Sequence, residues 1–250
     1  MMNKRGQITV FVIVGIMILV TVFLVFYFLG DRIKKQSDVD VVFDESSLEP
    51  LQDYIGDCIE KNGNEAIDLI SNGGKIDPGF FYYYDNKKIN YLCYSNNFGP
   101  CERKEPFISK LFEDEIKNYI INKLPLCIDL SSLRNEGYDV QEGQMDVDAD
   151  VLDYSVIITL NYPITISKGN SKVNENKFVR TFNVPLGRIA EVSKDVIDSE
   201  ISYGVFFNQV YEVKHPEVTV KSYEPVNVVV YTISLRGYDY DFRFAVRSWT

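Results

Sequence analysis

Three aspartates at alternate positions, Asp146, Asp148 and Asp150, have the spacing in this sequence that comes closest to a metal-binding motif. The pattern D-x-D-x-D opens an EF-hand calcium loop, whose sixth residue is glycine and whose twelfth is glutamate. Those two positions hold Val151 and Ile157 here, so the loop is incomplete. Alternate residues of a strand point to one face. The sequence therefore predicts a solvated face of carboxylates, with a loose cation site as the alternative, and no metal or other cofactor.

His215 is the only histidine, and it stands beside Pro216 in a predicted turn. The sequence has no G-x-S-x-G motif to supply a serine nucleophile, and no P-loop or G-x-G-x-x-G motif to bind phosphates. Serine-hydrolase and nucleotide-dependent chemistry are therefore not expected. Glycosidases use two carboxylates that meet only in the folded chain. A tethered envelope hydrolase accordingly remains an alternative, which a cleft lined with paired carboxylates would favour.

Four cysteines, Cys58, Cys93, Cys101 and Cys127, are the remaining candidates for chemistry. An even number in an extracytoplasmic domain suggests two disulfides. Three pairings are possible, and the most economical joins Cys93 to Cys101 across a short loop and Cys58 to Cys127 between two helices. Zinc binding is a rival interpretation, although the sequence has no C-x-x-C pair. Four free buried thiols are the third.

An uncharged apolar run from Ile8 to Leu29 is the element that would hold all of these groups at a membrane. As a helix it would be about 33 Å long, enough to cross the hydrocarbon core of a bilayer. The run is too long for a removable secretory signal, and the residues after it do not match an A-x-A cleavage site. Basic residues flank it on both sides: Lys4, Arg5, Arg32, Lys34 and Lys35. The sequence predicts an N-terminal transmembrane anchor that contacts the lipid bilayer through residues 8–29.

The chain beyond the anchor is acidic. Residues 36–250 carry 21 basic and 35 acidic side chains, a formal charge of −14. A surface of that sign repels nucleic acid and anionic lipid, so no nucleic-acid partner is expected. A soluble, solvated surface is the simple interpretation of this charge, and a surface that binds cations or a basic partner is the alternative.

The spacing of apolar residues predicts an α+β fold, in which helices pack on an antiparallel β-sheet. Apolar residues three and four positions apart indicate helices over 49–72, 106–123 and 186–203, with a short helical piece within 126–135. Pro125 is expected to limit the second helix. Alternating or aromatic-rich runs indicate strands over 80–84, 89–94, 154–162 extended by 164–166, 177–184, 206–213, 218–223, 226–234 and 240–246.

The predicted organisation has four parts. A signal-anchor helix over 1–30 leads into an acidic, hydroxyl-bearing stalk over 31–50. A helical subdomain with an aromatic hairpin follows over 51–135, and a mainly antiparallel β subdomain with one helix covers 136–250. The apolar residues of these last two parts are numerous enough for a substantial core.

The aromatic hairpin is the predicted contact surface. Two aromatic-rich runs, 80–84 and 89–94, flank the turn signal at 85–88. Successive strand residues point to opposite faces, so a run of consecutive aromatic residues cannot easily bury every ring. Packing of alternate rings in the core is the simple interpretation. The alternative is a surface for a protein or envelope partner, whose candidate residues are Tyr82, Tyr83, Tyr84 and Tyr91.

The junction Lys4-Arg5-Gly6-Gln7 before a long apolar helix resembles the archaeal class III signal, the start of type IV pilin-like proteins. In that family a prepilin-type peptidase cuts close to the glycine. The resemblance implies export, with the amino terminus inside and the large domain outside. The family has a glutamate a few residues after the glutamine, where this chain has Phe11. Anchoring is therefore implied more directly than filament assembly.

The whole chain also resembles a group of uncharacterised single-pass membrane proteins of archaea with small genomes. Four short motifs carry this resemblance: Gly6 to Phe11, Tyr54 to Glu60 with Gly73-Gly74, Leu124 to Cys127, and Phe242 to Arg247. The group has no assigned activity, so the resemblance implies an architecture and no chemistry.

Together these features predict a membrane-anchored cell-surface protein of non-enzymatic, binding or structural type. Its C-terminal domain is expected to be extracytoplasmic. A pilin-like subunit of a surface filament and a tethered envelope hydrolase are the two alternatives.

Overall fold

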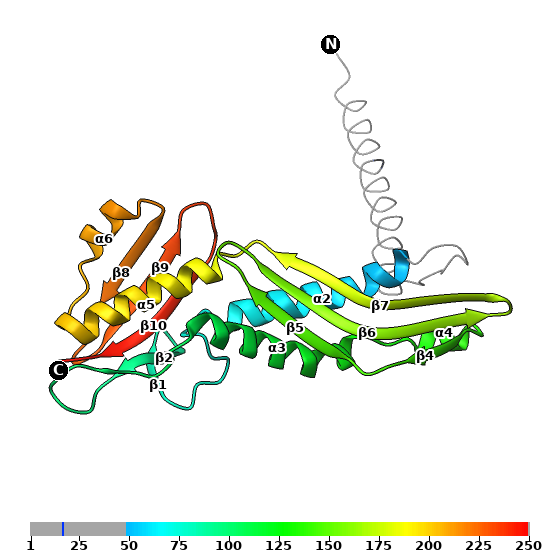
Figure 1. Ribbon diagram of the computed structural model, residues 1–250, viewed down its shortest axis with the longest axis horizontal. Coiled ribbons are helices and arrows are strands. Elements are labelled where there is room, and N and C mark those ends of the chain that lie inside the picture. The colour runs from blue at the N-terminus through cyan, green and yellow to red at the C-terminus, as the bar shows by residue number, and fades with distance from the viewer. Residues whose placement is uncertain (1–16, 18–48, 250) are drawn as a thin grey trace, which may run out of the picture. The chain divides into compact units, whose positions relative to one another are not determined.

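A computed structural model of the chain describes Met17 and residues 49–249, and those from 49 onward belong to one unit (Figure 1). The predicted signal junction from Lys4 to Gln7, the apolar run over 8–29 apart from Met17, and the stalk up to residue 48 lie outside the described residues. None of the helices in the described part of the chain combines the length and apolar character that a membrane span requires.

The described unit is a mixed α+β structure, as the sequence predicts. Its helices are α2 (Glu49–Leu69), α3 (Ile108–Cys127), α4 (Ser131–Asn135), α5 (Leu186–Tyr203) and α6 (Asn208–Lys214). Its strands are β1 (Phe81–Tyr84), β2 (Lys87–Tyr94), β3 (Glu102–Arg103), β4 (Asp139–Glu142), β5 (Asp146–Val151), β6 (Val156–Lys168), β7 (Ser171–Phe182), β8 (Val218–Tyr223), β9 (Val229–Leu235) and β10 (Asp241–Arg247).

The first sheet has the strand order β1-β2-β10-β9-β8, and the short β3 also pairs with β2. Adjacent strands in this sheet are antiparallel except for β2 and β10, which are parallel to each other. Tyr231 and Phe244 form a cross-strand pair that faces α5, because the Tyr231 hydroxyl donates a hydrogen bond to Glu200 on that helix. The adjacent pair of Val230 and Ala245 must then point to the opposite face.

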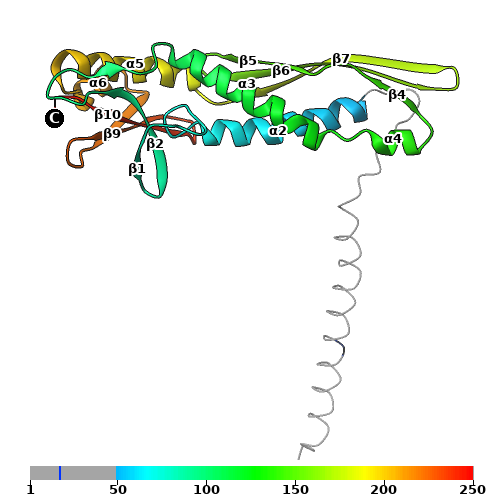
Figure 2. The same ribbon diagram turned by 90° about the horizontal axis from the view of Figure 1, so that it is seen from below.

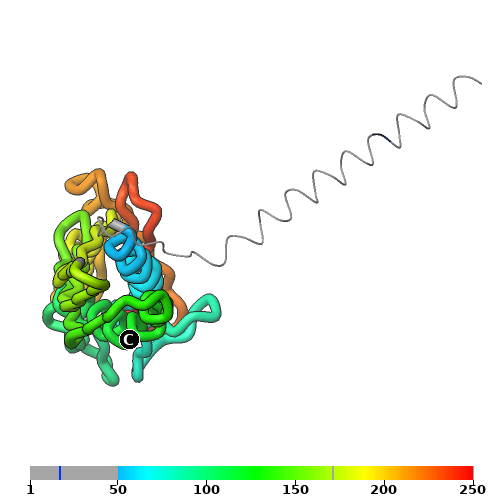
Figure 3. Tube along the Cα trace, turned by 90° about the vertical axis from the view of Figure 1, so that its right-hand side faces the viewer, coloured from blue at the N-terminus to red at the C-terminus, as the bar shows by residue number. Residues whose placement is uncertain are grey.

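The second sheet is built around β6, with β7 along one edge and β4 and β5 in succession along the other. Helix α2 contacts β7 and β6 while α3 contacts β5, so the two helices cover one face together (Figures 2 and 3). Gly63 allows α2 to approach closely, since a Cβ there would lie 2.3 Å from the Phe182 ring. The Phe112 and Phe242 rings, 5.2 Å apart, join α3 to the first sheet.

The predicted boundary between residues 135 and 136 does not separate two sheets. Strand β2, from the predicted helical subdomain, pairs with β10 from the predicted β subdomain. Each strand alone leaves a row of backbone donors and acceptors unpaired, and their pairing satisfies both. The first sheet therefore draws on both halves of the described chain.

Two predicted elements are wrong in detail. Helix α3 continues through Pro125 to Cys127. Pro125 has no N–H and so removes one backbone hydrogen bond from the helix. The disulfide between Cys127 and Cys58 holds the end of the helix in place and offsets that loss. The sequence predicts a strand over 206–213, whereas Asn208–Lys214 form the short helix α6. Aromatic and β-branched residues there favour a strand, but the apolar residues do not alternate and α6 buries none of its residues, so no strand face is selected by burial.

Candidate contact surface and polar clusters

The β1–β2 hairpin positions the tyrosines that the sequence singles out. Asp85 and Asn86 occupy its turn with φ values of 49° and 58°, and positive φ at both positions is what a two-residue type I′ turn requires. Tyr82 pairs with Ile89 across the hairpin, which fixes its register. Along residues 81–84 the side chains alternate between exposed and half-buried. The hairpin therefore presents two different faces.

The inward face of the hairpin belongs to the core. Tyr82, Tyr84 and Tyr94 pack against a buried cluster of Ile89, Tyr91, Val228, Val230 and Ala245. The ring of Tyr84 lies 5.1 Å from that of Tyr223 on β8, which ties the hairpin across the sheet. Tyr91 is only 7% exposed and stacks at 4.9 Å on Phe80. Tyr91, a predicted contact residue, is therefore a core residue and is not presented to a partner.

The outward face carries Phe81 and Tyr83, which are 37% and 63% exposed. Lys88 lies beside them, with its Nζ 5.0 Å from the Phe81 ring centroid and 3.1 Å from Asp77 Oδ1. We call Phe81, Tyr83 and Lys88 the hairpin face. Exposed aromatic rings on a short ordered strand can be desolvated by a partner at small conformational cost, and such rings are enriched in protein interfaces. Of the four predicted contact residues, Tyr83 is the one that fits this role most fully.

Both disulfides of the economical pairing are present, which confirms that prediction. Cys58 is bonded to Cys127, and Cys93 to Cys101, so none of the described cysteines is free. The first bond ties the middle of α2 to the last residue of α3. The second closes the loop after β2. Oxidised cysteines cannot serve as thiolate zinc ligands, and the zinc and free-thiol interpretations are excluded for these residues.

The three alternating aspartates lie on β5 with their side chains exposed, as the sequence predicts. Lys117 on α3 reaches them, with its Nζ 3.1 Å from Asp148 Oδ1 and 3.7 Å from Asp146 Oδ1. The ammonium group thus occupies the position between these carboxylates where a cation would bind. Within residues 49–249 no group of three or more His, Cys, Asp or Glu side chains is arranged to hold a metal ion.

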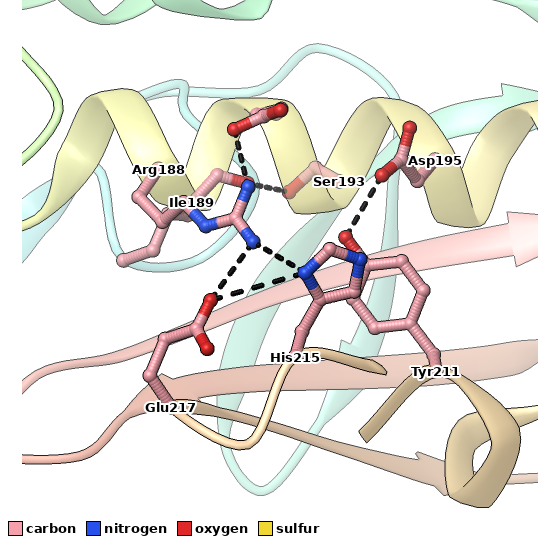
Figure 4. Close-up of polar contacts among 8 residues, drawn as sticks. Arg188, Ile189, Ser193, Asp195, Tyr211, His215 and Glu217 are labelled. Carbon is pink, nitrogen blue, oxygen red and sulfur yellow. Dashed lines mark hydrogen bonds and ion pairs between the residues drawn. The ribbon is translucent and has the colours of Figure 1, made fainter. Parts of the chain in front are cut away.

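His215 lies after α6 and joins a polar cluster with Arg188 (Figure 4). The Arg188 Nη2 atom is 3.0 Å from His215 Nδ1 and 2.9 Å from Glu217 Oε1. Arginine can only donate, so the imidazole Nδ1 accepts this hydrogen bond. The sequence could not have indicated the cluster, because Arg188 and Glu217 are separated by 29 positions and no spacing rule relates them.

The Arg188 guanidinium and the carboxylates of Glu191 and Glu217 stabilise one another in their charged forms. Burial lowers the pKa of Arg188, but its hydrogen bonds to Glu191 and Glu217 outweigh burial and raise that pKa. The Glu217 backbone N–H and the Arg188 guanidinium lower the pKa of the Glu217 carboxyl. Tyr211 on α6 donates a 2.8 Å hydrogen bond to Asp195 on α5. These contacts fasten α6 and the start of β8 to α5, which is a structural role.

A cleft of about 490 Å³ lies between three segments that are distant in the chain. Helix α2 contributes one wall, the end of β7 with the residues after it a second, and the β9–β10 turn the third. Its lining residues are Glu60, Asn64, Ile67, Asp68, Arg180, Thr181, Phe182, Asn183, Val184, Tyr238, Asp239 and Tyr240. Sequence reasoning missed this cleft, because no local pattern brings α2 and the β9–β10 turn together.

Comparison of the chain with protein-family models, with curated proteins and with solved structures finds no match in any of the three. The hairpin face, the two disulfides and the cleft are thus the features from which a function must be inferred.

Proposed function

We propose that this chain is a membrane-tethered, extracytoplasmic protein that binds a protein or other envelope component through the hairpin face, without enzymatic activity. The observation that carries the proposal is the alternation along β1, which packs the half-buried Tyr82 and Tyr84 against the core and leaves Phe81 and Tyr83 exposed. Residues that served the core alone would not require two further aromatic rings on the solvent side.

The proposed location rests on the cysteines and the apolar run. Disulfides form and persist in oxidising compartments and are rare in the cytosol, and all four described cysteines are paired. The run over 8–29 is long enough to anchor the chain, and the class III-like junction before it implies export of the residues that follow.

The proposed binding mode rests on the energetics of aromatic side chains. Interface hot spots are enriched in tyrosine and cost at least about 2 kcal/mol when they are truncated. Tyr83, at 63% exposure, has most of its ring surface available for burial. Its backbone is fixed by pairing with Lys88, so little ordering entropy is lost on binding.

A tethered hydrolase receives less support from the same structure. The cleft does contain three carboxylates, from Glu60, Asp68 and Asp239. A glycosidase places one carboxylic acid in an apolar pocket so that it stays protonated, beside an ionised partner. All three carboxylates of the cleft are exposed to solvent, which suits the binding of a cation better than proton transfer.

The double variant Phe81→Ser/Tyr83→Ser is expected to weaken binding to envelope fragments about 30-fold or more, the equivalent of one lost hot spot. The full-length chain would be held in lipid nanodiscs, and the fragments prepared from cells that lack it. Sedimentation with the fragments measures the affinity.

The matched control is Tyr203→Ser/Phe207→Ser, which removes a tyrosine and a phenylalanine that are more exposed than the hairpin pair, from the end of α5 and from the residue just before α6. Binding by the control should stay within twofold of the unmodified chain. Equal losses in both double variants, or a hairpin variant that binds normally, would contradict the role of the hairpin face.

A further inference from the structure

The outer edge of β1 carries backbone groups that point away from the sheet. Strand β1 is the first in the strand order and pairs with β2 alone, and the hairpin projects from the rest of the unit (Figure 2). Across the two-residue turn the Tyr84 carbonyl faces the Lys87 N–H. The direction of these groups alternates along an antiparallel strand. Tyr82 and Tyr84 therefore bond to β2, and the N–H and C=O groups of Phe81 and Tyr83 point outward.

Nothing in residues 49–249 fills these outward positions. The backbone hydrogen bonds of loops and turns include none to Phe81 or Tyr83, and no side chain is bonded to their backbone. Unpaired N–H and C=O groups at a sheet edge are a ready template for a further strand. The outer edge of β1 is therefore open to pairing.

Other edge strands of the two sheets are protected. On β8 the Val220 N–H donates a hydrogen bond of 2.8 Å to the Glu212 carboxylate of α6. On β5 the Val151 N–H donates one of 3.3 Å to the Glu113 carboxylate of α3. Strand β7 carries lysine and arginine side chains, which discourage pairing at an edge. Strand β1 has neither device, because its sequence is F-Y-Y-Y.

The side chains of β1 would gain contacts on both faces from a strand added at this edge. Phe81 and Tyr83 are exposed on one face, and Tyr82 and Tyr84 are half-buried on the other. A neighbouring strand would lie about 4.8 Å away, with its side chains alternating between the same two faces. It would therefore cover parts of all four rings. A partner that only touched the hairpin face would leave Tyr82 and Tyr84 as they are.

We propose that the partner of the hairpin face is a protein that adds an extended segment to the outer edge of β1. This inference rests on the proposed function and names the class and form of the partner. The segment would exchange backbone hydrogen bonds with Phe81 and Tyr83, which supply affinity in strand addition. Its alternate side chains would be apolar and preferably β-branched, since such residues pair well with aromatic rings across strands.

Hydrogen exchange of the unmodified full-length chain in nanodiscs, alone and sedimented with the envelope fragments, tests the backbone pairing. We expect the Phe81 and Tyr83 amides to exchange at least tenfold more slowly in the bound state, because pairing withdraws them from water. The Tyr82 and Tyr84 amides already bond to β2, so they are the matched control and should slow less. Unchanged exchange at Phe81 and Tyr83, or equal slowing of all four amides, would overturn strand addition.

Comparing Tyr83→Pro with Tyr83→Ser separates the outward N–H from the ring. Both variants lose the ring, and only proline also loses the N–H, which the hairpin does not use. Sedimentation should show Tyr83→Pro binding about fivefold more weakly than Tyr83→Ser, the effect of one hydrogen bond. Hydrogen exchange at Tyr82 and Tyr84 checks that the hairpin still forms. Equal binding by the two variants would contradict the pairing.

Digestion of the fragments with a protease tests the class of the partner. We expect it to abolish binding by the unmodified chain. Binding that survives digestion and still depends on Tyr83 would show a glycan or lipid partner, which overturns this inference and leaves the hairpin face as the contact surface. Normal binding by the earlier variant Phe81→Ser/Tyr83→Ser would instead refute the proposed function itself.

Discussion

Replacing Cys58 and Cys127 together by alanine is expected to lower the free energy of unfolding by about 4 kcal/mol. The disulfide joins residues 69 positions apart, and loss of the crosslink restores the loop-closure entropy of the unfolded chain. The folded state also loses the covalent bond that holds the end of α3 against α2. Tyr54, one turn before Cys58, donates a hydrogen bond of 2.9 Å to the Cys127 carbonyl and accepts one of 2.9 Å from the Asp129 N–H.

Urea unfolding followed by circular dichroism measures this effect, with Cys93→Ala/Cys101→Ala as the matched control. The control bond spans only 8 positions, so its removal should cost about 2.5 kcal/mol. Equal losses in the two double variants would contradict the view that the Cys58–Cys127 bond restrains the larger loop.

Glu200→Ala is expected to lower the free energy of unfolding by about 3–5 kcal/mol, because it leaves two buried hydroxyl groups without an acceptor. Glu200 is 1% exposed, and its carboxylate accepts hydrogen bonds from Tyr231 on β9 and from Ser248 after β10. Burial and the charge of Glu200 raise the pKa of Tyr231. The indole N–H of Trp249 donates to the Glu200 carbonyl at 3.2 Å, so this residue fastens the C-terminal end of the sheet to α5.

Glu200→Gln separates the hydrogen bonds from the charge. The amide keeps one acceptor and adds a donor, and a hydroxyl can reverse its role, so this variant should lose about 1 kcal/mol. Thermal unfolding of the two variants checks the difference. Similar melting temperatures for Glu200→Ala and the unmodified chain would show that the buried contacts contribute little.

Much of the fold could be predicted because its signals are local. Helix α5 begins and ends where the spacing of Ile189, Val192 and Val196 indicates, and Gly204 ends it with a φ of 68°. The hairpin follows from Asp85-Asn86 between aromatic runs. The disulfides could be predicted because four cysteines allow only three pairings. The simplest of these joins one pair across a short loop and the other pair between two helices.

The remaining features depend on contacts between distant segments. The face that each hairpin ring occupies is set by the register of β1 and by the cluster around Val230, more than 140 positions away. None of the residues of α6 is buried, so its apolar side chains do not mark a core-facing side, and the sequence alone did not identify the helix. The cleft and the Arg188 cluster exist only once α5, α2 and the β9–β10 turn have packed, so no spacing in the sequence reveals them.

The location of the domain is the central claim, and impermeant maleimide labelling of intact cells tests it most directly. The variant Ser132→Cys places a free thiol at an exposed position and serves as the control for access. The account predicts that intact cells label Ser132→Cys without reduction, and that the four native cysteines label only after reduction. Labelling of the native cysteines without reduction, and only after lysis, would place the domain in the cytoplasm. That result would contradict the proposed location, the disulfides and the surface binding role together.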